Sequence, residues 1–234
     1  MAKDPDEGKK DPNLVEQLTA DGDLTPEWRA TFLAVPRHVF IPDTIWRHDP
    51  TIDGPNDLVP VRRREQPDRW LEIAYENWSV TVQVDDGYPV GPDGHGRDIS
   101  SSASHPGIVA QMLAASGVQP GERMLEIGTG TGYNTALLAH RLGAPNVVSV
   151  EIDERLVEHA QRALKTAGYD AVTVLAGDGA LGHHDRAPYD RVLCTASVQH
   201  VPDAWVSQTR PGGRILTPWA NAYFDGVAGA GATR

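Results

Sequence analysis

Residues 124–151 constrain the fold more than any other part of this chain. They begin with a short apolar run at 124–127 and continue through three glycines at alternate positions. The segment that follows has apolar residues at helical spacing, and a second apolar run then ends in the carboxylate of Glu151. This order predicts a strand, a tight turn, a helix and a second strand, which is the βαβ unit of nucleoside-binding proteins.

The spacing of the glycines and the acid indicates which nucleoside is bound. Gly128, Gly130 and Gly132 let the chain turn sharply and let a ligand approach the backbone. The helix N-terminus that follows favours an anionic group, and Glu151 is placed to accept hydrogen bonds from both ribose hydroxyls. A dinucleotide fingerprint needs glycine where Tyr133 stands, so the pattern favours S-adenosylmethionine. An ordinary buried turn of another α/β protein is the alternative.

The composition limits the class of partner. The chain has 234 residues, 40% of them hydrophobic, which is enough for one main core. Its net charge of −11 argues against a nucleic-acid partner, because phosphates would be repelled, and favours a small molecule or a peptide. The single cysteine, Cys194, excludes a disulfide framework and is expected in the core. With no signal peptide and no long apolar run, we expect a cytoplasmic protein without a membrane partner.

Composition and periodicity divide the chain into three parts. Residues 1–12 are charged and turn-rich, which predicts a disordered tail. Residues 13–98 are expected to form an N-terminal helical segment and an inserted lobe, with 47–70 as a long loop or part of that lobe. Residues 99–234 alternate apolar strands with helices, which predicts a doubly wound α/β domain with a parallel sheet that binds the cofactor.

Shorter signals predict individual elements. Thr25 and Pro26 mark a helix start, as N-cap and first helical residue. We expect a strand at 78–84, and a helix at 203–208 that is followed by a final strand at 214–217. After that strand, roughly fifteen residues remain, which is scarcely enough for an antiparallel hairpin of two more strands. We therefore expect a truncated or differently built edge.

Several motifs, taken in order, resemble those of one family. The carrying segments are 35–42 (VPRHVFIP), 102–105 (SASH), 125–133, 177–179 (GDG), 187–190 (APYD) and 211–214 (PGGR) with Pro218. In this order they resemble the protein L-isoaspartate O-methyltransferases, over about residues 28–219 with an interruption at 47–70. The resemblance implies a Rossmann-like class I fold, S-adenosylmethionine as the methyl donor, S-adenosylhomocysteine as a product, and a protein or peptide substrate.

Two departures from the family pattern suggest a specialised branch. Ser104 stands where the family's segment has proline, and a serine run, Ser100–Ser102, precedes it. With the 47–70 segment, this looks like a branch associated with ribosomally made peptide natural products, the lanthipeptides and graspetides. Related enzymes there methylate an aspartate of a macrocyclised peptide. We therefore expect modification of such a peptide rather than general protein repair.

A carboxylate acceptor needs little catalytic machinery. An aspartyl or isoaspartyl carboxylate has a reference pKa near 4, so it is ionised at neutral pH and requires no general base. The enzyme mainly has to align the acceptor with the sulfonium methyl group and exclude water. The resulting methyl ester is open to attack by the neighbouring backbone nitrogen, which closes a succinimide.

The resemblance assigns the acceptor side to the SASH segment. It places Ser102 beside the acceptor carboxylate as a hydrogen-bond donor, with Ser101 and Ser104 as second choices and His105 closing the pocket. A helix-capping serine is the structural alternative for Ser102.

On the cofactor side, Glu126 is expected to orient the cofactor or backbone amides, and a solvated acid at a strand end is the alternative. Asp178 should accept from the adenine amino group while the Gly179 N–H meets the ring, with a plain Asp-Gly turn as the alternative. The full predicted cofactor set is Glu126, Gly128, Thr129, Gly130, Gly132, Tyr133, Asn134, Glu151, Ile152, Asp178, Gly179 and Thr195.

Two other classes of function stay open. His200 follows the fourth predicted strand, where small-molecule O-methyltransferases carry a base that deprotonates a hydroxyl. A non-catalytic domain that keeps the fold as a binding scaffold is the other. The adjacent histidines at 183–184 point apart, so we expect no metal. The arginine run at 62–64 is either a solvated face or a dock for an acidic peptide.

Overall fold

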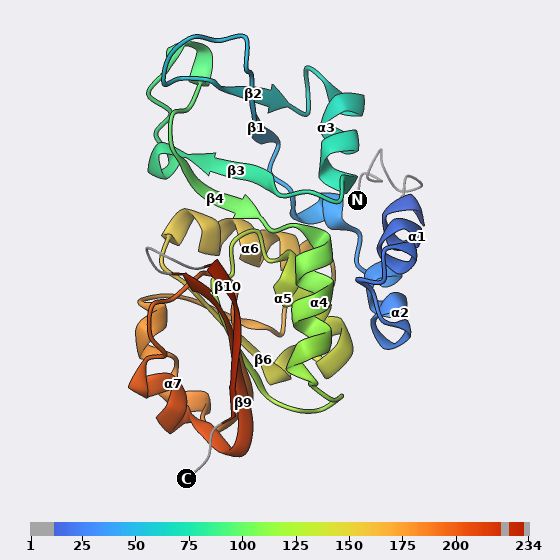
Figure 1. Ribbon diagram of the computed structural model, residues 1–234, viewed down its shortest axis with the longest axis vertical. Helices are drawn as coiled ribbons and strands as arrows, with labels where there is room; N and C mark the ends of the chain where they lie inside the picture. The colour runs from blue at the N-terminus through green and yellow to red at the C-terminus, as the bar shows by residue number, and fades with distance from the viewer. Residues whose placement is uncertain (1–11, 221–224, 232–234) are drawn as a thin grey trace. The chain divides into compact units, whose positions relative to one another are not determined.

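The structure is a computed structural model that describes residues 12–220 and 225–231 (Figure 1). The chain divides into two compact units, Met1–Ala110 and Gln111–Arg234, and each is described by itself. The division that we expected from the sequence lay earlier, between residues 98 and 99. The tail predicted at 1–12 lies outside the described residues apart from Pro12, at which the first helix begins.

Two helices and a single turn open the first unit. They are α1 (Pro12–Ala20), α2 (Pro26–Ala34) and the 3-10 turn η1 (Arg37–Phe40). The predicted start of α2 is confirmed, with Thr25 extended at the N-cap and Pro26 at the first helical position. Proline suits that position because its missing N–H would have no partner inside the helix.

Four antiparallel strands form the sheet of the first unit, in the order β2-β1-β3-β4. The strands are β1 (Thr44–His48), β2 (Leu58–Arg62), β3 (Val80–Val84) and β4 (Ile99–Ala103), with α3 (Pro67–Tyr75) between β2 and β3 and the 3-10 turns η2 (Asp85–Gly87) and η3 (Pro92–Gly94) between β3 and β4. Ile45, Trp70 and Ile73 are fully buried at the centre of its core. This unit therefore has a hydrophobic core of its own.

The expectation of a long loop at 47–70 is wrong, because the segment contributes to two strands and a helix. The interpretation of the segment as part of a lobe agrees with its place in the small sheet. Pro60 lies inside β2, which is an edge strand, so its lack of an N–H leaves the ladder with β1 intact.

The second unit contains a six-stranded sheet in the order β10-β9-β8-β5-β6-β7. The division between the units falls within helix α4 (Pro106–Ser116). Its further elements are β5 (Met124–Ile127), α5 (Tyr133–Leu142), η4 (Ala144–Asn146), β6 (Val147–Glu151), α6 (Glu154–Thr166), β7 (Thr173–Ala176), η5 (Gly179–Leu181), η6 (His184–Arg186), β8 (Tyr189–Cys194), α7 (Asp203–Gln208), β9 (Thr209–Ala220) and β10 (Asp225–Gly231). Strands β5 to β9 run parallel, so the predicted doubly wound α/β fold is confirmed.

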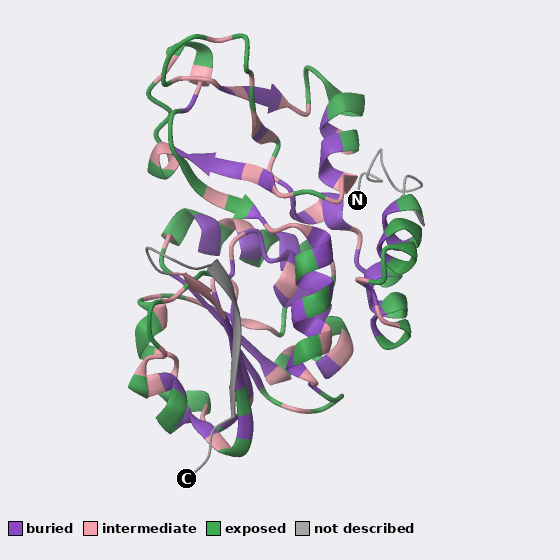
Figure 2. Ribbon diagram, viewed as in Figure 1, coloured by how far each residue is buried: buried purple, intermediate pink, exposed green. Residues whose placement is uncertain are grey.

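The middle strands of this sheet carry its core. Figure 2 shows them as an almost continuously buried layer, in purple. Leu125, Val148 and Val192 are at most 2% exposed and pack with Trp205 of α7. Cys194 is 1% exposed, which confirms its predicted place in the core. Among the described residues, no helix has the length and apolar character to cross a membrane.

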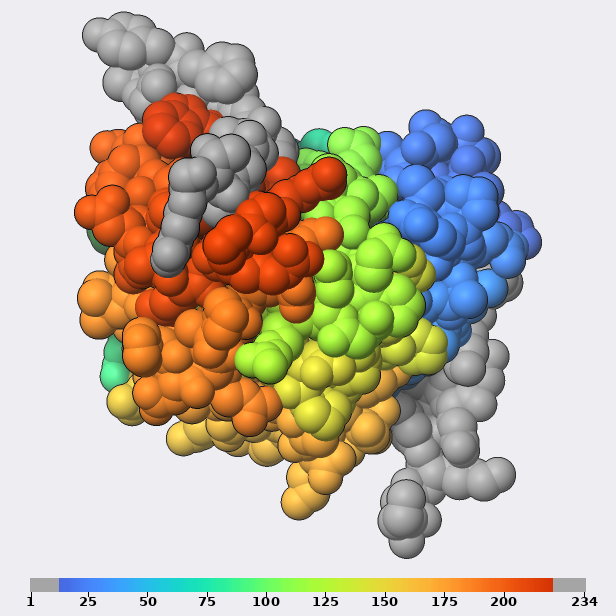
Figure 3. Space-filling model, turned by 90° about the horizontal axis from the view of Figure 1, so that it is seen from below, coloured from blue at the N-terminus to red at the C-terminus, as the bar shows by residue number. Residues whose placement is uncertain are grey.

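The C-terminal edge of the sheet differs from the expected pattern. Strand β9 begins at Thr209 rather than near residue 214, so the Pro-Gly-Gly segment lies within it, beside an irregular register with β8. Figure 3 shows β9, in red-orange, beside the orange residues that lead into it. Strand β10 pairs antiparallel with β9. In the described residues, one antiparallel strand therefore completes this edge.

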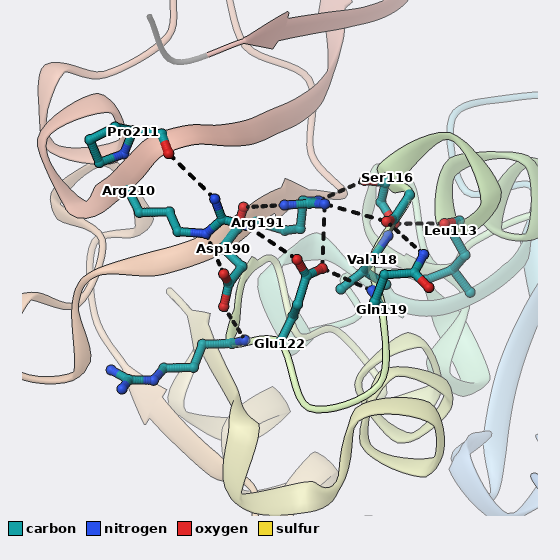
Figure 4. Close-up of polar contacts among 11 residues, drawn as sticks. Leu113, Ser116, Val118, Gln119, Glu122, Asp190, Arg191, Arg210 and Pro211 are labelled. Carbon is teal, nitrogen blue, oxygen red and sulfur yellow. Dashed lines mark hydrogen bonds and ion pairs between the residues drawn. The ribbon is translucent and has the colours of Figure 1, made fainter. Parts of the chain in front are cut away.

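A network of charged side chains joins the amino ends of β8 and β5 to the end of α4 (Figure 4). Arg191 is buried, and its guanidinium donates to the carbonyl oxygens of Ser116 at 3.0 Å and Asp190 at 2.8 Å. The Glu122 carboxylate lies 3.4 Å from Arg191 and 3.3 Å from Arg210. Arg191 thus provides donors for backbone carbonyls at the end of α4 and near the start of β8.

Candidate functional site

The predicted cofactor residues come together at the carboxyl ends of four adjacent parallel strands. The turns after β5, β6, β7 and β8 are linked by backbone hydrogen bonds. Gly128 N donates to Val150 O at 2.8 Å, and Gly177 N donates to Glu151 O at 2.9 Å. Thr195 N donates to Ile127 O at 2.9 Å. This edge of an open α/β sheet is where ligands bind.

The glycines after β5 are required by backbone shape and by close packing. Gly128, Gly130 and Gly132 have φ values of 90°, 53° and 87°, which side chains disfavour. A Cβ on Gly128 would lie 2.6 Å from the Thr195 hydroxyl oxygen, which itself donates to the Gly128 carbonyl at 2.7 Å. A Cβ on Gly179 would lie 2.4 Å from a methyl group of Ile127. The turns therefore approach each other more closely than other residues allow.

Glu151 presents a carboxylate at the tip of β6 that is held by backbone N–H groups. One oxygen accepts from Gly130 N at 2.8 Å, and the other accepts from Ile152 N at 2.9 Å and Asp153 N at 3.3 Å. A carboxylate has about four lone-pair sites, so this one retains capacity for a further donor such as a ribose hydroxyl. The next side chain, Ile152, is 77% exposed and offers an apolar surface beside the acid. These groups fit an adenosine.

Asp178 lies at the turn after β7. One of its oxygens accepts from Ala180 N at 2.9 Å, and the described residues give the other oxygen no hydrogen bond. Trp205 holds the turn by donating from Nε1 to Gly179 O at 2.7 Å. The exposed carboxylate therefore sits on a fixed turn.

Glu126, which we expected to orient the cofactor or backbone amides, is fully buried and bonded to side chains. Its carboxylate accepts from Asn134 Nδ2 at 2.6 Å, from Thr135 Oγ1 at 2.5 Å and from Ser149 Oγ at 2.6 Å. Burial raises the pKa of Glu126 to about 7, against the opposing effect of these three hydrogen bonds. The alternative of a solvated acid is therefore wrong.

The Glu126 cluster joins the two strands and the helix that enclose the glycine turn. Ser149 faces Glu126 in the β5–β6 register and also bonds Thr129 Oγ1 at 2.6 Å. The side chains of Thr129 and Tyr133 are buried, 4% and 5% exposed, so only their backbone is available to a ligand. Thr135 and Ser149 are site residues that were not predicted from the sequence. A serine within the apolar strand 147–151 was the available signal.

The predicted acceptor residues lie in the first unit. Ser101 and Ser102 are on β4, where Ser102 is exposed and opposite Thr81 of β3. Because Ser102 is inside a strand and α4 begins at Pro106, the helix-cap alternative is wrong. His105 Nδ1 accepts from Gly107 N at 3.1 Å, and its ring meets the Trp78 ring edge-on at 5.5 Å. Ser104 lies between the end of β4 and His105, and it is half-buried.

The remaining candidates are His200, the arginines at 62–64 and the adjacent histidines at 183–184. His200 is exposed, after β8. Arg63 lies over the Trp70 ring at 4.7 Å, and Arg62 donates to Asp93 O at 2.5 Å, so two of the three arginines at 62–64 have intramolecular partners. In the described part of the chain, His183 and His184 belong to no group of three metal-ligating side chains.

Comparison with known families decides the class of this site. The profile described as protein-L-isoaspartate(D-aspartate) O-methyltransferase (PCMT) matches residues 57–226. The chain belongs to this family. Protein-L-isoaspartate O-methyltransferases are S-adenosylmethionine-dependent enzymes, so the enzyme class and the methyl donor predicted from the glycine turn agree with the family. The matched region begins inside the 47–70 segment and includes β2.

Curated relatives of the PCMT family support the assignment over most of the chain. A protein-L-isoaspartate O-methyltransferase from Hyperthermus butylicus is 32% identical over 222 residues, covering 91% of this chain and 76% of the relative. One from Dictyoglomus thermophilum is 32% identical over 221 residues, covering 94% and 81%. A protein-L-isoaspartate O-methyltransferase 2 from a Polaromonas species is 42% identical over 133 residues, covering 57% of this chain and 60% of the relative.

Solved structures of the family share the fold. One protein-L-isoaspartate O-methyltransferase superposes with a TM-score of 0.66 at 28% identity, covering 88% of this chain, which spans 54% of the length of that one. A Plasmodium falciparum protein described as a PCMT, solved with S-adenosyl-L-homocysteine, gives a TM-score of 0.67 at 18% identity, covering 93% and 87%. The second likeness concerns the fold alone.

Proposed function

We propose that this chain transfers a methyl group from S-adenosylmethionine to an aspartyl or isoaspartyl carboxylate in a peptide. The observation that carries the proposal is the Glu151 carboxylate. It is fixed by backbone N–H groups and stands beside an exposed isoleucine at the ligand-binding edge of a PCMT-family sheet. Such an acid suits a ribose diol, and membership of the family supplies the acceptor class.

Each side of the cofactor cradle has a residue suited to it. Glu151 accepts from the two ribose hydroxyls, and Ile152 covers a face of the adenine. Asp178 uses its oxygen without a described partner to accept from the adenine amino group, while Gly179 N–H meets the ring. Thr195 anchors the glycine turn from β8, and the buried Glu126 cluster holds the shape of that turn. When bound, S-adenosylmethionine supplies an electrophilic methyl group.

At the acceptor carboxylate, methyl transfer needs a hydrogen-bond donor and the exclusion of water rather than a base. The substrate carboxylate is already ionised at neutral pH, since its reference pKa is near 4. Ser102 is the proposed donor, because its exposed hydroxyl has no described hydrogen-bond partner within the chain. Ser101 and Ser104 are the second choices. His105, whose ring meets the Trp78 ring edge-on, is proposed to close the same pocket.

The ester product has a further reaction open to it. The backbone nitrogen that follows the esterified residue attacks the ester carbonyl, a C–N bond forms, and the C–O bond to the methoxy group breaks. The amide proton and methoxide leave together as methanol, and a five-membered succinimide remains. Methoxide is a far better leaving group than oxide, so this ring closure requires no additional residue of the enzyme.

We propose a peptide natural product, in the cytoplasm, as the substrate rather than damaged protein in general. The departures of this chain from the family pattern support this, above all Ser104 in place of proline and the serine run on β4. A macrocyclised peptide of the lanthipeptide or graspetide type presents its aspartate in a constrained loop. Such an acceptor needs a different surface from an unfolded isoaspartyl segment.

The test offers three peptides to the protein with S-adenosylmethionine and follows their masses. The peptides are a linear isoaspartyl peptide, its aspartyl counterpart and a macrocyclised precursor peptide with one aspartate in the ring. Addition of a methyl group followed by loss of methanol, strongest for the cyclic peptide, is expected. Methylation of the linear isoaspartyl peptide alone would replace the natural-product substrate with a repair substrate. No methylation of any carboxylate would overturn the proposal, and Glu151→Ala is the control for the donor.

A further inference from the structure

Arg37 is a fully buried arginine that binds backbone carbonyls from two separate segments. Its side chain is 1% exposed. Nη1 donates to Ala74 O at 3.1 Å and Glu76 O at 3.0 Å, at the end of α3. Nη2 donates to Trp78 O at 3.3 Å, just before β3. The same nitrogen donates to Ala103 O at 3.3 Å and Ser104 O at 3.0 Å, at the end of β4.

The two segments that Arg37 joins also contact each other directly. Gly107 N donates to Asn77 Oδ1 at 3.0 Å. The rings of His105 and Trp78 meet edge-on. Arg37 is therefore buried where residues 74–78 contact the SASH segment. The carbonyl oxygens of Ala103, at the end of β4, and of Ser104 both accept hydrogen bonds from this one guanidinium.

We propose that Arg37 is a positioning residue that holds the SASH segment in the conformation that presents Ser102 to the acceptor carboxylate. This inference rests on the proposed function, which places the acceptor beside Ser102. Arg37 does not touch the substrate in this account. It acts through the backbone of Ala103 and Ser104, which immediately follow the donor serine.

The chemistry of the guanidinium explains why arginine stands here. Its two terminal nitrogens are held in one plane and point their N–H groups in different directions. Nη1 serves the end of α3, and Nη2 serves both Trp78 and the end of β4. A lysine ammonium is one compact centre with three donors, so it cannot replace all five of these hydrogen bonds. Arg37→Lys should keep the charge while removing some of these bonds and loosening the contact between the two segments.

Arg37→Lys therefore tests the positioning role, and Arg191→Lys is the matched control. Arg191 is also a buried arginine that binds backbone carbonyls, in the second unit (Figure 4). For each protein we would measure the melting temperature, the Kd for S-adenosylhomocysteine by calorimetry, and kcat and KM for the best methylated peptide. Hydrogen exchange of the segment 99–107 provides a readout that does not require activity.

Arg37→Lys is expected to exchange faster at 99–107 and to lose about tenfold or more in kcat/KM for the peptide, with its Kd for S-adenosylhomocysteine within about twofold of wild type. Arg191→Lys is expected to lower the melting temperature while its folded fraction keeps the wild-type kcat/KM. Equal losses in cofactor affinity and kcat/KM for Arg37→Lys would make Arg37 a general structural residue and overturn the inference.

A second variant keeps the inference open to contradiction if Arg37→Lys does not fold. Ala103→Gly leaves Arg37 in place and loosens the backbone that it holds. A lower kcat/KM with unchanged cofactor affinity is expected, and wild-type kcat/KM would overturn the inference. A wild-type protein that binds S-adenosylhomocysteine and methylates no peptide would overturn the proposed function and this inference together. Unchanged exchange at 99–107 in Arg37→Lys, with an active wild type, would overturn this inference alone.

Discussion

Ser149 donates a hydrogen bond to Glu126 across the β5–β6 pair, at 2.6 Å, in a part of the sheet from which water is excluded. Asn134 and Thr135 complete the set of donors from α5. The carboxyl group is thereby surrounded by polar side chains although it lies in the core. Because Glu126 lies between the glycine turn and β6, its protonation state reports on the packing of this part of the site.

Glu126 makes the stability of the protein depend on pH. Its pKa in the folded protein, about 7, lies above the reference value of 4.5, so the folded state binds the proton more tightly. The contribution of protonated Glu126 to the unfolding free energy is complete below about pH 4.5 and is lost as pH rises through about 7, amounting to roughly 3 kcal/mol. Glu126→Gln should flatten this dependence in urea unfolding between about pH 5 and 8.

Glu16→Gln is the control for that measurement, because Glu16 is an exposed glutamate on α1. It should keep the pH dependence of the wild-type protein. A Glu126→Gln protein whose unfolding free energy retains the wild-type slope with pH would show that Glu126 does not titrate as the burial implies.

A side chain at Gly128 should disrupt the cofactor turn. Gly128→Ala combines an unfavourable φ of 90° with a Cβ 2.6 Å from the Thr195 hydroxyl oxygen. Gly121→Ala has a similar φ of 83° but no atom within 4 Å of its Cβ, so it carries the backbone strain alone. Both variants should lose about 1–2 kcal/mol of stability from the backbone. Only Gly128→Ala should weaken S-adenosylhomocysteine binding in calorimetry, and equal affinities would contradict the packing argument.

Ser102→Ala should lower peptide methylation without changing cofactor affinity. A hydrogen bond to a charged group contributes about 1.5–3 kcal/mol, so kcat/KM should fall by about tenfold or more. Ser100→Ala is the comparison, because Ser100 lies on the same strand and its hydroxyl already bonds Gln83 at 2.9 Å. Similar kinetics for the two alanine variants would remove Ser102 from the acceptor site.

His200→Ala separates a carboxylate acceptor from a hydroxyl acceptor. A carboxylate needs no base, so methyl transfer should change by less than about threefold and should not acquire a new pH dependence. Steady-state rates across a pH series provide the measurement. A rate loss of about a hundredfold, with a rise in wild-type activity that follows histidine deprotonation, would favour the hydroxyl-directed enzyme instead.

The sequence predicted best where local signals agree with tertiary packing. The limits of β5 and α7 match the predicted ranges, and the turn between β5 and α5 follows directly from its glycines. Periodicity, turn chemistry and the acidic strand end all specify the same βαβ unit there. The predicted cofactor residues gather at one edge because parallel strands align their carboxyl ends.

Elements that depend on distant partners were missed. The strand β2 contains Pro60, and β4 is composed largely of serine, so neither has the residue preferences of a strand. Their pairing with β1 and β3 supplies what the local sequence lacks. The role of Arg37 is equally invisible in the sequence, because its acceptors are carbonyls 37 to 67 positions away. Backbone acceptors carry no signature in residue type.

Calorimetric titration with S-adenosylhomocysteine tests the central claim most directly, in the wild-type protein, in Glu151→Ala and in Glu158→Ala, an exposed acid on α6. Loss of two charge-assisted hydrogen bonds should weaken binding by about tenfold to a hundredfold or more in Glu151→Ala. Glu158→Ala should bind as the wild type does. A wild-type protein that binds no S-adenosylhomocysteine, or a Glu151→Ala protein with wild-type affinity, would contradict the account.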